Sequence, residues 1–519
     1  MSHNISRKSV NIYFVLFELV VLLLTMEALS SGLYFLIWSF LTVRCSMASD
    51  RISNIFVSPE GMDVKICGKE SQPCLSLDFA ISIARESGAN STQIKAAEGN
   101  YTLTKSYRFT NVENFGMVGQ GSTPKDVQIT CKSNVSLSFV LSENIFFEGI
   151  MLQNCGGWQK SAVRAKKPYS GLDGVNFKTA LDFRYCKNIR FYGVEILSSS
   201  GLAVNCYDCG GVVNFTNSAF TENTARYSNA TQRNLSRSIE DNFFGNQSKN
   251  NVFSGGGVYL GLDPYGSNTV QVSPSKHDSY QHNNTYIFQN CRFLGNEALW
   301  RNKSKQNDFV DTPELPFSRG GGLAIYFRSN ASGCLVDVES CAFIRNRADW
   351  GGGLMLEMKE ESRRNLFTMA NTIFDSNEGR MAGGGIRIGN FIKGSGRGLN
   401  TFSVINCSFV RNEAVWGGGA SIFGTTIPDT TAYDLTQFYF NECHWSENTG
   451  TVGAAMASFL SNQNEDQIGP EIPYQVTLNF STFQGNRVIR KEQLVTIGEG
   501  ALFSIQVPLI FQEIGRAHV

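Results

Sequence analysis

Three tryptophans occupy the same position of a repeated motif in this chain. Trp300, Trp350 and Trp416 each follow an asparagine by four residues, in the segments NEALW, NRADW and NEAVW. An indole ring has a broad apolar face and a polar N–H, so a row of such rings at a surface could bind sugar rings by stacking. The spacing therefore predicts a glycan-stacking surface. The alternative is that the rings pack between neighbouring turns of the chain.

Asparagines recur in the same motif, three residues after an aromatic residue. Side-chain amides at equivalent positions of stacked strands would lie about 4.8 Å apart and could form a hydrogen-bonded row. Such a row would satisfy the backbone groups of tight turns, so we expect a structural ladder. A polar row presented to a ligand is the alternative. The predicted members of the ladder are Asn346, Asn377, Asn412, Asn448 and Asn486.

The cysteines indicate an oxidising compartment. Of the 13 cysteines, Cys45 lies in the apolar N-terminal segment, and the even number that remains suits disulfide pairing. Cys67 and Cys74 bracket a short loop and are one candidate disulfide. Cys407 and Cys443 both precede the repeat aromatic by two residues, so they would lie one strand apart and within disulfide reach. A stack of small buried residues is the alternative for this second pair.

Other chemistry has little support in the sequence. The triple glycines of the motif lack the Lys-Ser/Thr pair and the helix of a phosphate-binding loop, so they predict turns. Cys206 and Cys209 form a C-x-x-C pair with no second pair at zinc spacing. Asp349 lies near Arg345 and Arg347, where we expect a solvated turn. We therefore predict no catalytic residue, no cofactor and no metal site.

Asn-x-Ser/Thr sequons are frequent, as in proteins that pass through a secretory pathway. Asn-rich turns and Ser/Thr-rich strands also generate this pattern by composition alone. The candidate N-glycosylation positions are Asn90, Asn100, Asn134, Asn214, Asn229, Asn234, Asn246, Asn283, Asn302, Asn330, Asn406 and Asn479.

The motif also indicates the elements that must position these residues. Four copies between residues 336 and 459 share an alternating apolar strand, an aromatic-x-x-Asn step and a glycine cluster that opens a second strand. Successive repeat aromatics lie 31, 35 and 36 residues apart. A period of this size means that one small unit is stacked many times. The predicted fold is all-β, a right-handed parallel β-helix.

The ends of the chain differ from the repeats. Residues 1–48 are mainly apolar after Arg7 and Lys8 and predict a signal peptide cleaved near Ala48, with an uncleaved signal anchor as the alternative. Residues 49–105 predict an N-terminal cap, with a short capping helix over Leu75 to Arg85. The β-helix follows over 106–512. Residues 513–519, EIGRAHV, resemble a translated sequencing adaptor, so we expect a C-terminal truncation.

Bulk composition excludes some function classes. The chain has 45 basic and 45 acidic residues, without the basic surplus of a nucleic-acid-binding protein. Its 50 glycines and 38 phenylalanines are typical of a turn-rich β protein with aromatic packing.

Several of these motifs resemble a known group of proteins. The phrase CG…QPCLSL, the short alternating strands and the FxxN…GGG copies look like the pectin-lyase-like superfamily of right-handed β-helices, over about residues 55–505. The FxxN and GG-apolar signature, over about 210–505, is similar to polymorphic outer-membrane-protein repeats. That resemblance implies adhesion at a cell surface. The signal segment and the sequons favour a eukaryotic source, and the sequence departs from bacterial members in lacking an autotransporter barrel.

Enzymes of that superfamily imply a different set of residues. Its polysaccharide hydrolases resemble one another in Asn-x-Asp, Asp-Asp, Gly-His-Gly and Arg-x-Lys motifs, and this sequence has no Asp-Asp and no Gly-His-Gly. Its lyases need clustered carboxylates for calcium and a basic residue for proton abstraction.

We therefore predict a non-enzymatic, secreted or cell-surface scaffold that binds an extracellular protein or glycan for adhesion or recognition. It would bind no nucleic acid, and would meet a membrane only through an N-terminal anchor or a missing C-terminal segment. The alternative is a polysaccharide lyase, epimerase or related carbohydrate-active enzyme. A groove across a parallel sheet with converging carboxylates and Lys or Arg would favour this alternative.

Overall fold

The computed structural model describes fifteen stretches of the chain. The chain divides into two units, Met1–Ile52 and Ser53–Val519, of which the first lies outside the described residues together with the predicted signal segment. Residues 513–519 also lie outside them. The described residues are 53–86, 91–132, 135–158, 177–226, 253–254, 256–261, 282–299, 318–327, 331–358, 362–391, 400–426, 436–462, 474–489, 502–505 and 509–512.

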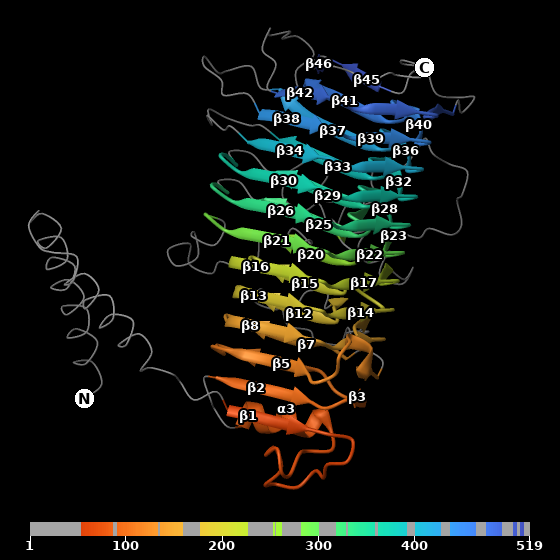
Figure 1. Ribbon diagram of the computed structural model, residues 1–519. Coiled ribbons are helices and arrows are strands. Elements are labelled where there is room, and N and C mark those ends of the chain that lie inside the picture. Colours follow the sequence, from red (N-terminus) through yellow and green to blue (C-terminus); the bar gives the residue numbers. More distant parts are fainter. Residues whose placement is uncertain are drawn as a thin grey trace, which may run out of the picture. The chain divides into compact units, whose positions relative to one another are not determined.

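The second unit is a stack of coils in which short strands return to the same faces (Figure 1). Along the chain, each coil contributes one strand to sheet 1, one to sheet 2 and one to sheet 4, and the next coil then begins again in sheet 1. In the later coils, a strand of sheet 3 lies between those of sheets 2 and 4. Strands within these four sheets pair in parallel with their counterparts one coil away. The predicted right-handed parallel β-helix is confirmed.

The strands of each sheet follow one another in chain order along the stack. Sheet 1 contains β1 (Ser53–Val57), β2 (Thr92–Ala96), β5 (Phe115–Gly119), β8 (Glu143–Glu148), β13 (Lys187–Tyr192), β16 (Gly210–Thr216), β21 (Thr285–Gln289), β26 (Leu335–Glu339), β30 (Leu366–Ala370), β34 (Thr401–Ile405), β38 (Thr436–Asn441), β42 (Tyr474–Asn479) and β46 (Leu509–Gln512). Sheet 2 contains β3 (Gly99–Leu103), β6 (Val127–Cys131), β9 (Met151–Gln153), β14 (Glu195–Leu197), β17 (Ala219–Thr221), β22 (Arg292–Leu294), β27 (Ala342–Ile344), β31 (Ile373–Asp375), β35 (Ser408–Val410), β39 (His444–Ser446) and β43 (Thr482–Gln484).

The other two sheets complete each coil. Sheet 3 contains β18 (Thr224–Arg226), β23 (Glu297–Leu299), β28 (Arg347–Trp350), β32 (Glu378–Ala382), β36 (Glu413–Trp416), β40 (Thr449–Val452) and β44 (Arg487–Val488), joined by β19 (Phe253–Ser254) and β24 (Ser318–Arg319). Sheet 4 contains β4 (Tyr107–Thr110), β7 (Leu137–Val140), β12 (Leu181–Arg184), β15 (Val204–Tyr207), β20 (Val258–Gly261), β25 (Leu323–Phe327), β29 (Leu354–Met358), β33 (Ile386–Phe391), β37 (Ala420–Thr426), β41 (Met456–Asn462) and β45 (Leu502–Ile505). A small antiparallel pair, β10 (Gly157–Trp158) and β11 (Phe177–Lys178), and a 3-10 turn, η1 (Pro124–Asp126), stand apart from the four sheets.

The repeat aromatics form a column in the core. The rings of Phe293, Phe343, Phe374, Phe409 and Trp445 are stacked nearly parallel, with successive centroids 4.6, 4.7, 5.0 and 4.0 Å apart. All five side chains are fully buried. Apolar residues at the inward positions of each strand therefore build one continuous core along the stack, which explains the period of the sequence.

The repeat asparagines form a buried hydrogen-bonded row beside this column. The Asn377 Oδ1 atom accepts hydrogen bonds from the backbone N–H and the side-chain Nδ2 of Asn346, both at 3.0 Å. In turn, Asn377 Nδ2 donates to the Asn412 Oδ1 atom at 2.9 Å and to the Phe343 carbonyl at 2.8 Å. The same bonds continue through the row, which we call the asparagine ladder: Asn223, Asn296, Asn346, Asn377, Asn412, Asn448 and Asn486.

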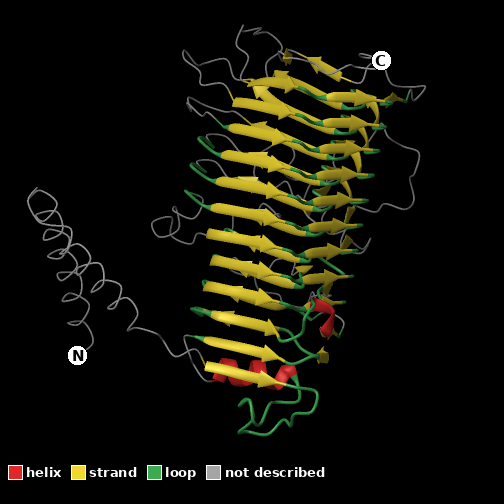
Figure 2. Cartoon of the chain, in the orientation of Figure 1, coloured by secondary structure: helices red, strands yellow, loops and turns green. Residues whose placement is uncertain are grey.

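One helix, α3 (Leu77–Glu86), covers the core at the first coil (Figure 2). The sequence pattern predicts this helix over Leu75 to Arg85, so its predicted start is two residues early and its predicted end one residue early. Its buried face includes Leu77, Ala80 and Ile81, and the Tyr107 hydroxyl donates to the Asp78 carbonyl at 2.8 Å. Within the described residues, no helix is long and apolar enough to cross a membrane.

One of the two candidate disulfides is present and the other is not. Cys67 and Cys74 form a disulfide, and a second one joins Cys131 to Cys155. The prediction of a Cys407–Cys443 disulfide is wrong, because both are free buried thiols. Each thiol instead hydrogen-bonds to a backbone carbonyl: Cys407 Sγ to the Ile405 oxygen at 3.2 Å and Cys443 Sγ to the Val404 oxygen at 3.5 Å. Burial raises the pKa of the Cys407 thiol to about 12, which disfavours its reactive thiolate.

Candidate active-site groove

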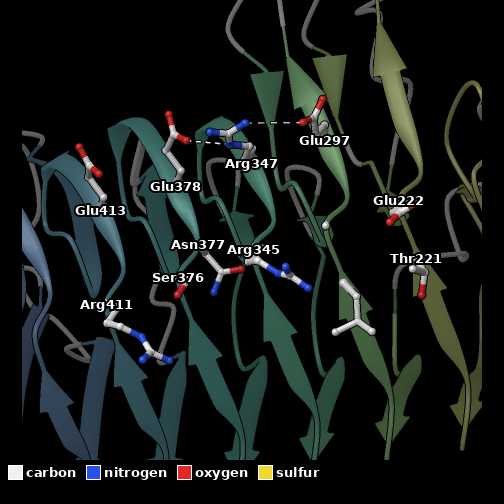
Figure 3. Close-up of a pocket in the computed structure, with 12 residues that line it drawn as sticks. Thr221, Glu222, Glu297, Arg345, Arg347, Ser376, Asn377, Glu378, Arg411 and Glu413 are labelled. Atoms are coloured by element: carbon white, nitrogen blue, oxygen red, sulfur yellow. Dashed lines mark hydrogen bonds and ion pairs between the residues drawn. The ribbon is translucent and has the colours of Figure 1, made fainter.

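A groove of about 580 Å³ runs across the turns that join sheet 2 to sheet 3 (Figure 3). It spans successive coils from β17 to β36, and the buried asparagine ladder forms its floor at Asn377. Charged side chains of both signs line it. They are Glu222, Glu297, Glu378, Glu413, Arg345, Arg347 and Arg411.

The side chains of Arg345, Ser376 and Arg411, in the lower part of Figure 3, each come from the residue immediately before a ladder asparagine, and we call these positions the lower row. This residue adopts the left-handed conformation, with φ of 53° at Glu222, 53° at Arg345, 55° at Ser376 and 54° at Arg411. Gly295 occupies the same position with φ of 60°. The left-handed residue turns the chain sharply from sheet 2 into sheet 3 while the asparagine points into the core. The sharp turn thus exposes one variable side chain per coil.

The upper row comes from the residue immediately after each ladder asparagine, which opens a strand of sheet 3. Glu297 pairs in register with Arg347, Arg347 with Glu378, and Glu378 with Glu413. Their side chains point outward because the next residue in each strand is buried, as at Ala348. Neighbouring members of this row are therefore about 4.8 Å apart at the backbone.

The guanidinium of Arg347 joins two of the carboxylates. Its Nε lies 2.7 Å from Glu378 Oε2, and its Nη1 lies 3.8 Å from Glu297 Oε1. The Arg347 and Glu378 side chains are about half exposed. Figure 3 shows the Glu413 side chain beside Glu378 on the next strand, and no ion pair or hydrogen bond of its carboxylate occurs among the described residues. One carboxylate of this neighbouring pair is held by a cation, and the other faces the groove.

A second ion pair lies in the lower part of the groove. Arg411 contacts the Asp375 carboxylate through Nη2 at 2.6 Å and Nε at 3.0 Å. Burial raises the pKa of Asp375, but the hydrogen bonds from Arg411 and Ser376 outweigh it, so this pKa lies below its ordinary value. Arg411 and Arg345 can also bind anionic groups, for which the planar guanidinium is well suited. The groove combines anion-binding groups with carboxylates that can transfer protons.

This site is not apparent from the sequence motifs. Of its charged residues, only Arg345 and Arg347 stand out in the sequence, beside Asp349. The signal is the charge adjacent to the asparagine in successive copies, as in GNE, RNR, SNE and RNE. Aligning the copies on the asparagine, and comparing one residue to each side, would have revealed both rows.

Asp349 does not belong to the groove, and the expectation that it lies in a solvated turn is wrong. Its side chain is buried, where it accepts hydrogen bonds from the backbone N–H and the hydroxyl of Ser318 at 2.8 and 3.0 Å. Arg380 Nε lies 2.6 Å from Asp349 Oδ1. Burial still raises the pKa of Asp349, because desolvation of the carboxylate outweighs the attraction of Arg380.

Of the three tryptophans of the predicted row, Trp350 and Trp416 do not line the groove. Trp300 is outside the described residues. Trp350 is half-buried in β28, with the guanidinium carbons of Arg319 and Arg387 at 5.3 and 4.3 Å from its ring centroid. Trp416 is half-buried in β36. Stacking of sugar rings on these residues stays a prediction.

Trp350 belongs to a buried charged cluster beside sheet 4. Arg319 forms an ion pair with the buried carboxylate of Glu357. Arg387 is only 3% exposed, and burial lowers its pKa to about 10. The charged groups of this cluster are mostly buried, so it offers less to a substrate than the groove.

The sequons lie in different environments. Asn100, Asn283 and Asn406 are exposed, whereas Asn214 and Asn479 are half-buried. Glycosylation at any of them stays a prediction. The others lie outside the described residues: Asn90, Asn134, Asn229, Asn234, Asn246, Asn302 and Asn330.

Comparisons with known proteins relate this chain to solved structures only. No protein-family model matches it, and no curated protein matches its sequence. It is similar in structure to the catalytic domain of a GH87 alpha-1,3-glucanase in complex with nigerose, with a TM-score of 0.36, 10% identity, and coverage of 91% of this chain and 70% of that one. It is also similar to the pectate lyase Pel9A, with a TM-score of 0.36, 11% identity, and coverage of 81% and 80%. The A-module of the Azotobacter vinelandii mannuronan C-5 epimerase AlgE6 gives a TM-score of 0.29, 9% identity, and coverage of 85% and 95%.

These findings correct the predicted function. The similar structures are named as carbohydrate-active enzymes, which contradicts our prediction of a non-enzymatic adhesion scaffold and favours its alternative. At this level of identity the likeness extends to the fold alone. The chemistry of this chain has to be argued from its own groove.

Proposed function

We propose that this protein is a carbohydrate-active enzyme that cleaves a linear, acidic polysaccharide bound along the groove. The observation that supports this most is the pair of carboxylates on adjacent strands, Glu378 and Glu413, with Arg347 bonded to only one of them. Converging carboxylates and arginines across parallel strands are the feature that separates an enzyme of this fold from a scaffold.

The two glutamates take different roles because their surroundings differ. The hydrogen bond from Arg347 Nε to Glu378 Oε2 holds the Glu378 carboxylate in place and leaves its other oxygen for the substrate. Glu413 faces the groove one strand away, and the proposal gives it the role of proton donor. Side chains on adjacent strands are about 5 Å apart, the separation used by retaining glycosidases.

The proposed reaction follows from this division. Glu413 protonates the glycosidic oxygen while a Glu378 oxygen bonds to the anomeric carbon, so the leaving sugar departs as an alcohol. Glu413, now a carboxylate, takes a proton from water, and that water displaces Glu378 from the anomeric carbon. The products are two shorter glycans, and both glutamates return to their starting states.

The repeat of the fold suits a polymer as substrate. Successive coils rise by about 4.8 Å, which is comparable to the length of one sugar unit, so each unit would meet an equivalent pair of positions. Arg345 and Arg411 lie two coils apart on the lower row and could bind acidic groups of the polymer. The exposed guanidiniums are the reason to propose an acidic polysaccharide over a neutral one.

A polysaccharide substrate also suits an exported protein. We propose export directed by residues 1–48, a cap over 49–105, a β-helix over 106–512 and glycosylation at the exposed sequons. Twelve sequons after residue 48 and an apolar N-terminal segment support this. The polymorphic outer-membrane-protein type of repeat and a eukaryotic source belong to the same proposal, which rests there on the sequence motif alone.

The test is a cleavage assay with the full chain. Polygalacturonate, polymannuronate and alpha-1,3-glucan are incubated with the protein, and new reducing ends are counted while products are identified by mass spectrometry. We expect reducing ends from an acidic polymer, with saturated products. Glu378→Gln and Glu413→Gln should each lower the rate by about 10²-fold or more. The matched control is Glu442→Gln, an exposed glutamate with a left-handed backbone at the turn into sheet 2, outside the groove.

Three results would count against the proposal. If none of the three polymers is cleaved, the protein does not have the proposed enzymatic function. If the two groove variants are as active as the control variant, the groove is not the active site. If the products are unsaturated, the reaction at this site is an elimination and not a hydrolysis.

A further inference from the structure

A second depression, of about 440 Å³, lies on the outer face of sheet 1 over β8 and β13. It lies in earlier coils than the groove and shares no residue with it. Aromatic and polar side chains alternate across it. We call this surface the aromatic platform, and its outward-facing residues are Asn144, Phe146, Glu148, Asn188, Arg190 and Tyr192.

Strand register sets the pattern of the platform. Phe146 pairs with Arg190, and Glu148 pairs with Tyr192, on the adjacent parallel strands. The two aromatic residues are therefore diagonal neighbours, about 8 Å apart at the backbone. Each has a charged residue beside it on the neighbouring strand. The result is two flat apolar surfaces separated by groups that form hydrogen bonds.

Gly116 leaves room for the ring of Phe146 to lie over the backbone of the neighbouring strand. Gly116 of β5 is the register partner of Phe146 on the side away from β13. A Cβ built at Gly116 would clash with the Phe146 ring, so this ring lies directly over the backbone of β5. Glycine in a strand marks a point where another group approaches the backbone closely. With one face against the backbone, the Phe146 ring turns its other face outward.

Tyr192 supplies a second exposed ring. Its side chain is 55% exposed, although the residue lies in the middle of the stack of coils. A flat aromatic ring with a polar hydroxyl suits a ligand that has both apolar and polar surface.

Polar side chains at the start of the same two strands are held in place. Asn188 Nδ2 donates to Asn144 Oδ1 at 3.1 Å, and Asn144 Nδ2 donates to Asn114 Oδ1 at 3.0 Å. Both amides therefore have fixed orientations, and each amide nitrogen carries a second N–H. Together with the exposed Arg190 and Glu148 they provide donors and acceptors around the rings.

We propose that the aromatic platform is a non-catalytic carbohydrate-binding subsite that takes an oligosaccharide. The C–H face of a sugar ring stacks on Phe146 or Tyr192, and its hydroxyls bind the amides and charged groups at the rim. The choice of carbohydrate as the ligand class rests on the proposed function. The inference that this surface binds a ligand is supported independently by the strand register, the packing of Phe146 over Gly116 and the exposed rings. It would hold part of the polymer away from the groove.

A binding measurement tests the aromatic platform, whereas the cleavage assay tests the proposed enzymatic function of the groove. The probes are purified oligosaccharides of galacturonate, mannuronate and alpha-1,3-linked glucose, titrated by calorimetry into the Glu413→Gln variant of the full chain so that nothing is cleaved. In this background we expect Tyr192→Ala and Phe146→Ala each to weaken binding by about three- to tenfold. Gly116→Ala should weaken it as well, because the new Cβ displaces the Phe146 ring.

Tyr439→Ala is the matched control, because Tyr439 also faces outward from sheet 1 but in β38, far along the stack. It should leave the affinity unchanged. Tyr192 is largely exposed, so its variant tests the platform even where Phe146→Ala reduces stability. Unchanged affinity in Tyr192→Ala and Gly116→Ala would overturn the proposal, as would the absence of binding to all three probes. If the platform variants lose binding while the parent protein, with Glu413 intact, cleaves none of the polymers, the platform is supported and the proposed enzymatic function is rejected.

Discussion

Arg347 donates from its Nε atom to Glu378 Oε2 across 2.7 Å, on neighbouring strands of sheet 3. This bond distinguishes Glu378 from Glu413, the next carboxylate in the same row. Two like carboxylates at one strand spacing would otherwise be equivalent. The position of a single guanidinium therefore assigns the roles of nucleophile and proton donor in the proposed reaction.

Replacing this guanidinium should affect catalysis more than binding. We expect Arg347→Met to lower kcat by about ten- to a hundredfold, since a hydrogen bond to a charged group is lost, while KM changes little. Steady-state kinetics on the cleaved polymer measure both. Arg487→Met, at the equivalent position of a later coil outside the groove, should match the parent protein. A large rise in KM with unchanged kcat would mean that Arg347 binds substrate and does not position Glu378.

The asparagine ladder should contribute strongly to stability. Asn377→Ala leaves the backbone N–H and the Nδ2 of Asn346 without their shared acceptor and removes two donated bonds. We expect a loss of about 2–5 kcal/mol, because buried donors stay unsatisfied. The measurement is the Tm from circular dichroism. Gln289→Ala, which removes an exposed bond of 3.4 Å to Glu339, should change the stability by less than about 0.5 kcal/mol.

The two disulfides should respond to reduction, and the repeat cysteines should not. The Cys131–Cys155 bond closes a loop with a sequence separation of 24, so its removal by Cys131→Ser and Cys155→Ser should cost about 3 kcal/mol. Alkylation of the denatured, unreduced protein, followed by peptide mass spectrometry, should label Cys407 and Cys443 but leave both disulfides unlabelled. Protection of Cys407 and Cys443 would mean that they are joined after all.

Alkaline pH should destabilise the N-terminal coils through Tyr101. Burial raises the pKa of this hydroxyl from 10.0 to about 12, and it donates to the Ala97 carbonyl at 2.8 Å. Because the folded-state pKa is the higher one, the stabilising contribution is complete below about pH 10 and is lost as pH rises towards 12. The Tm of the parent protein should fall more steeply over this range than that of Tyr101→Phe. Parallel curves for the two proteins would contradict the assignment.

Much of the fold follows from the sequence because its determinants are local and periodic. A buried aromatic residue, a turn and an asparagine must recur in every coil, since each coil offers the next the same core and the same unpaired turn amides. Phe343, Asn346 and their counterparts could therefore be aligned without a structure. The capping helix was also predictable, because its apolar residues follow helical spacing.

The site could not be derived in the same way. Neighbouring positions in the groove are separated by 31 to 73 residues in the chain, and they meet only because parallel pairing brings the coils into register. The left-handed backbone at Arg345 exposes its side chain. Asp349 lies in β28, where the register shifts between Ala348 and Trp350, and its carboxylate is buried although the sequence alone suggested a solvated turn. Side-chain direction depends on such backbone details, and charge pattern alone does not reveal it.

By itself, the sequence determined the coil, its period, and the aromatic and asparagine columns, because each of these is a repeated short-range requirement. Only the tertiary structure decided which charged residues converge, which cysteines pair, and that Phe146 lies over Gly116. Those outcomes depend on register between distant strands and on the direction in which each turn sends its side chain.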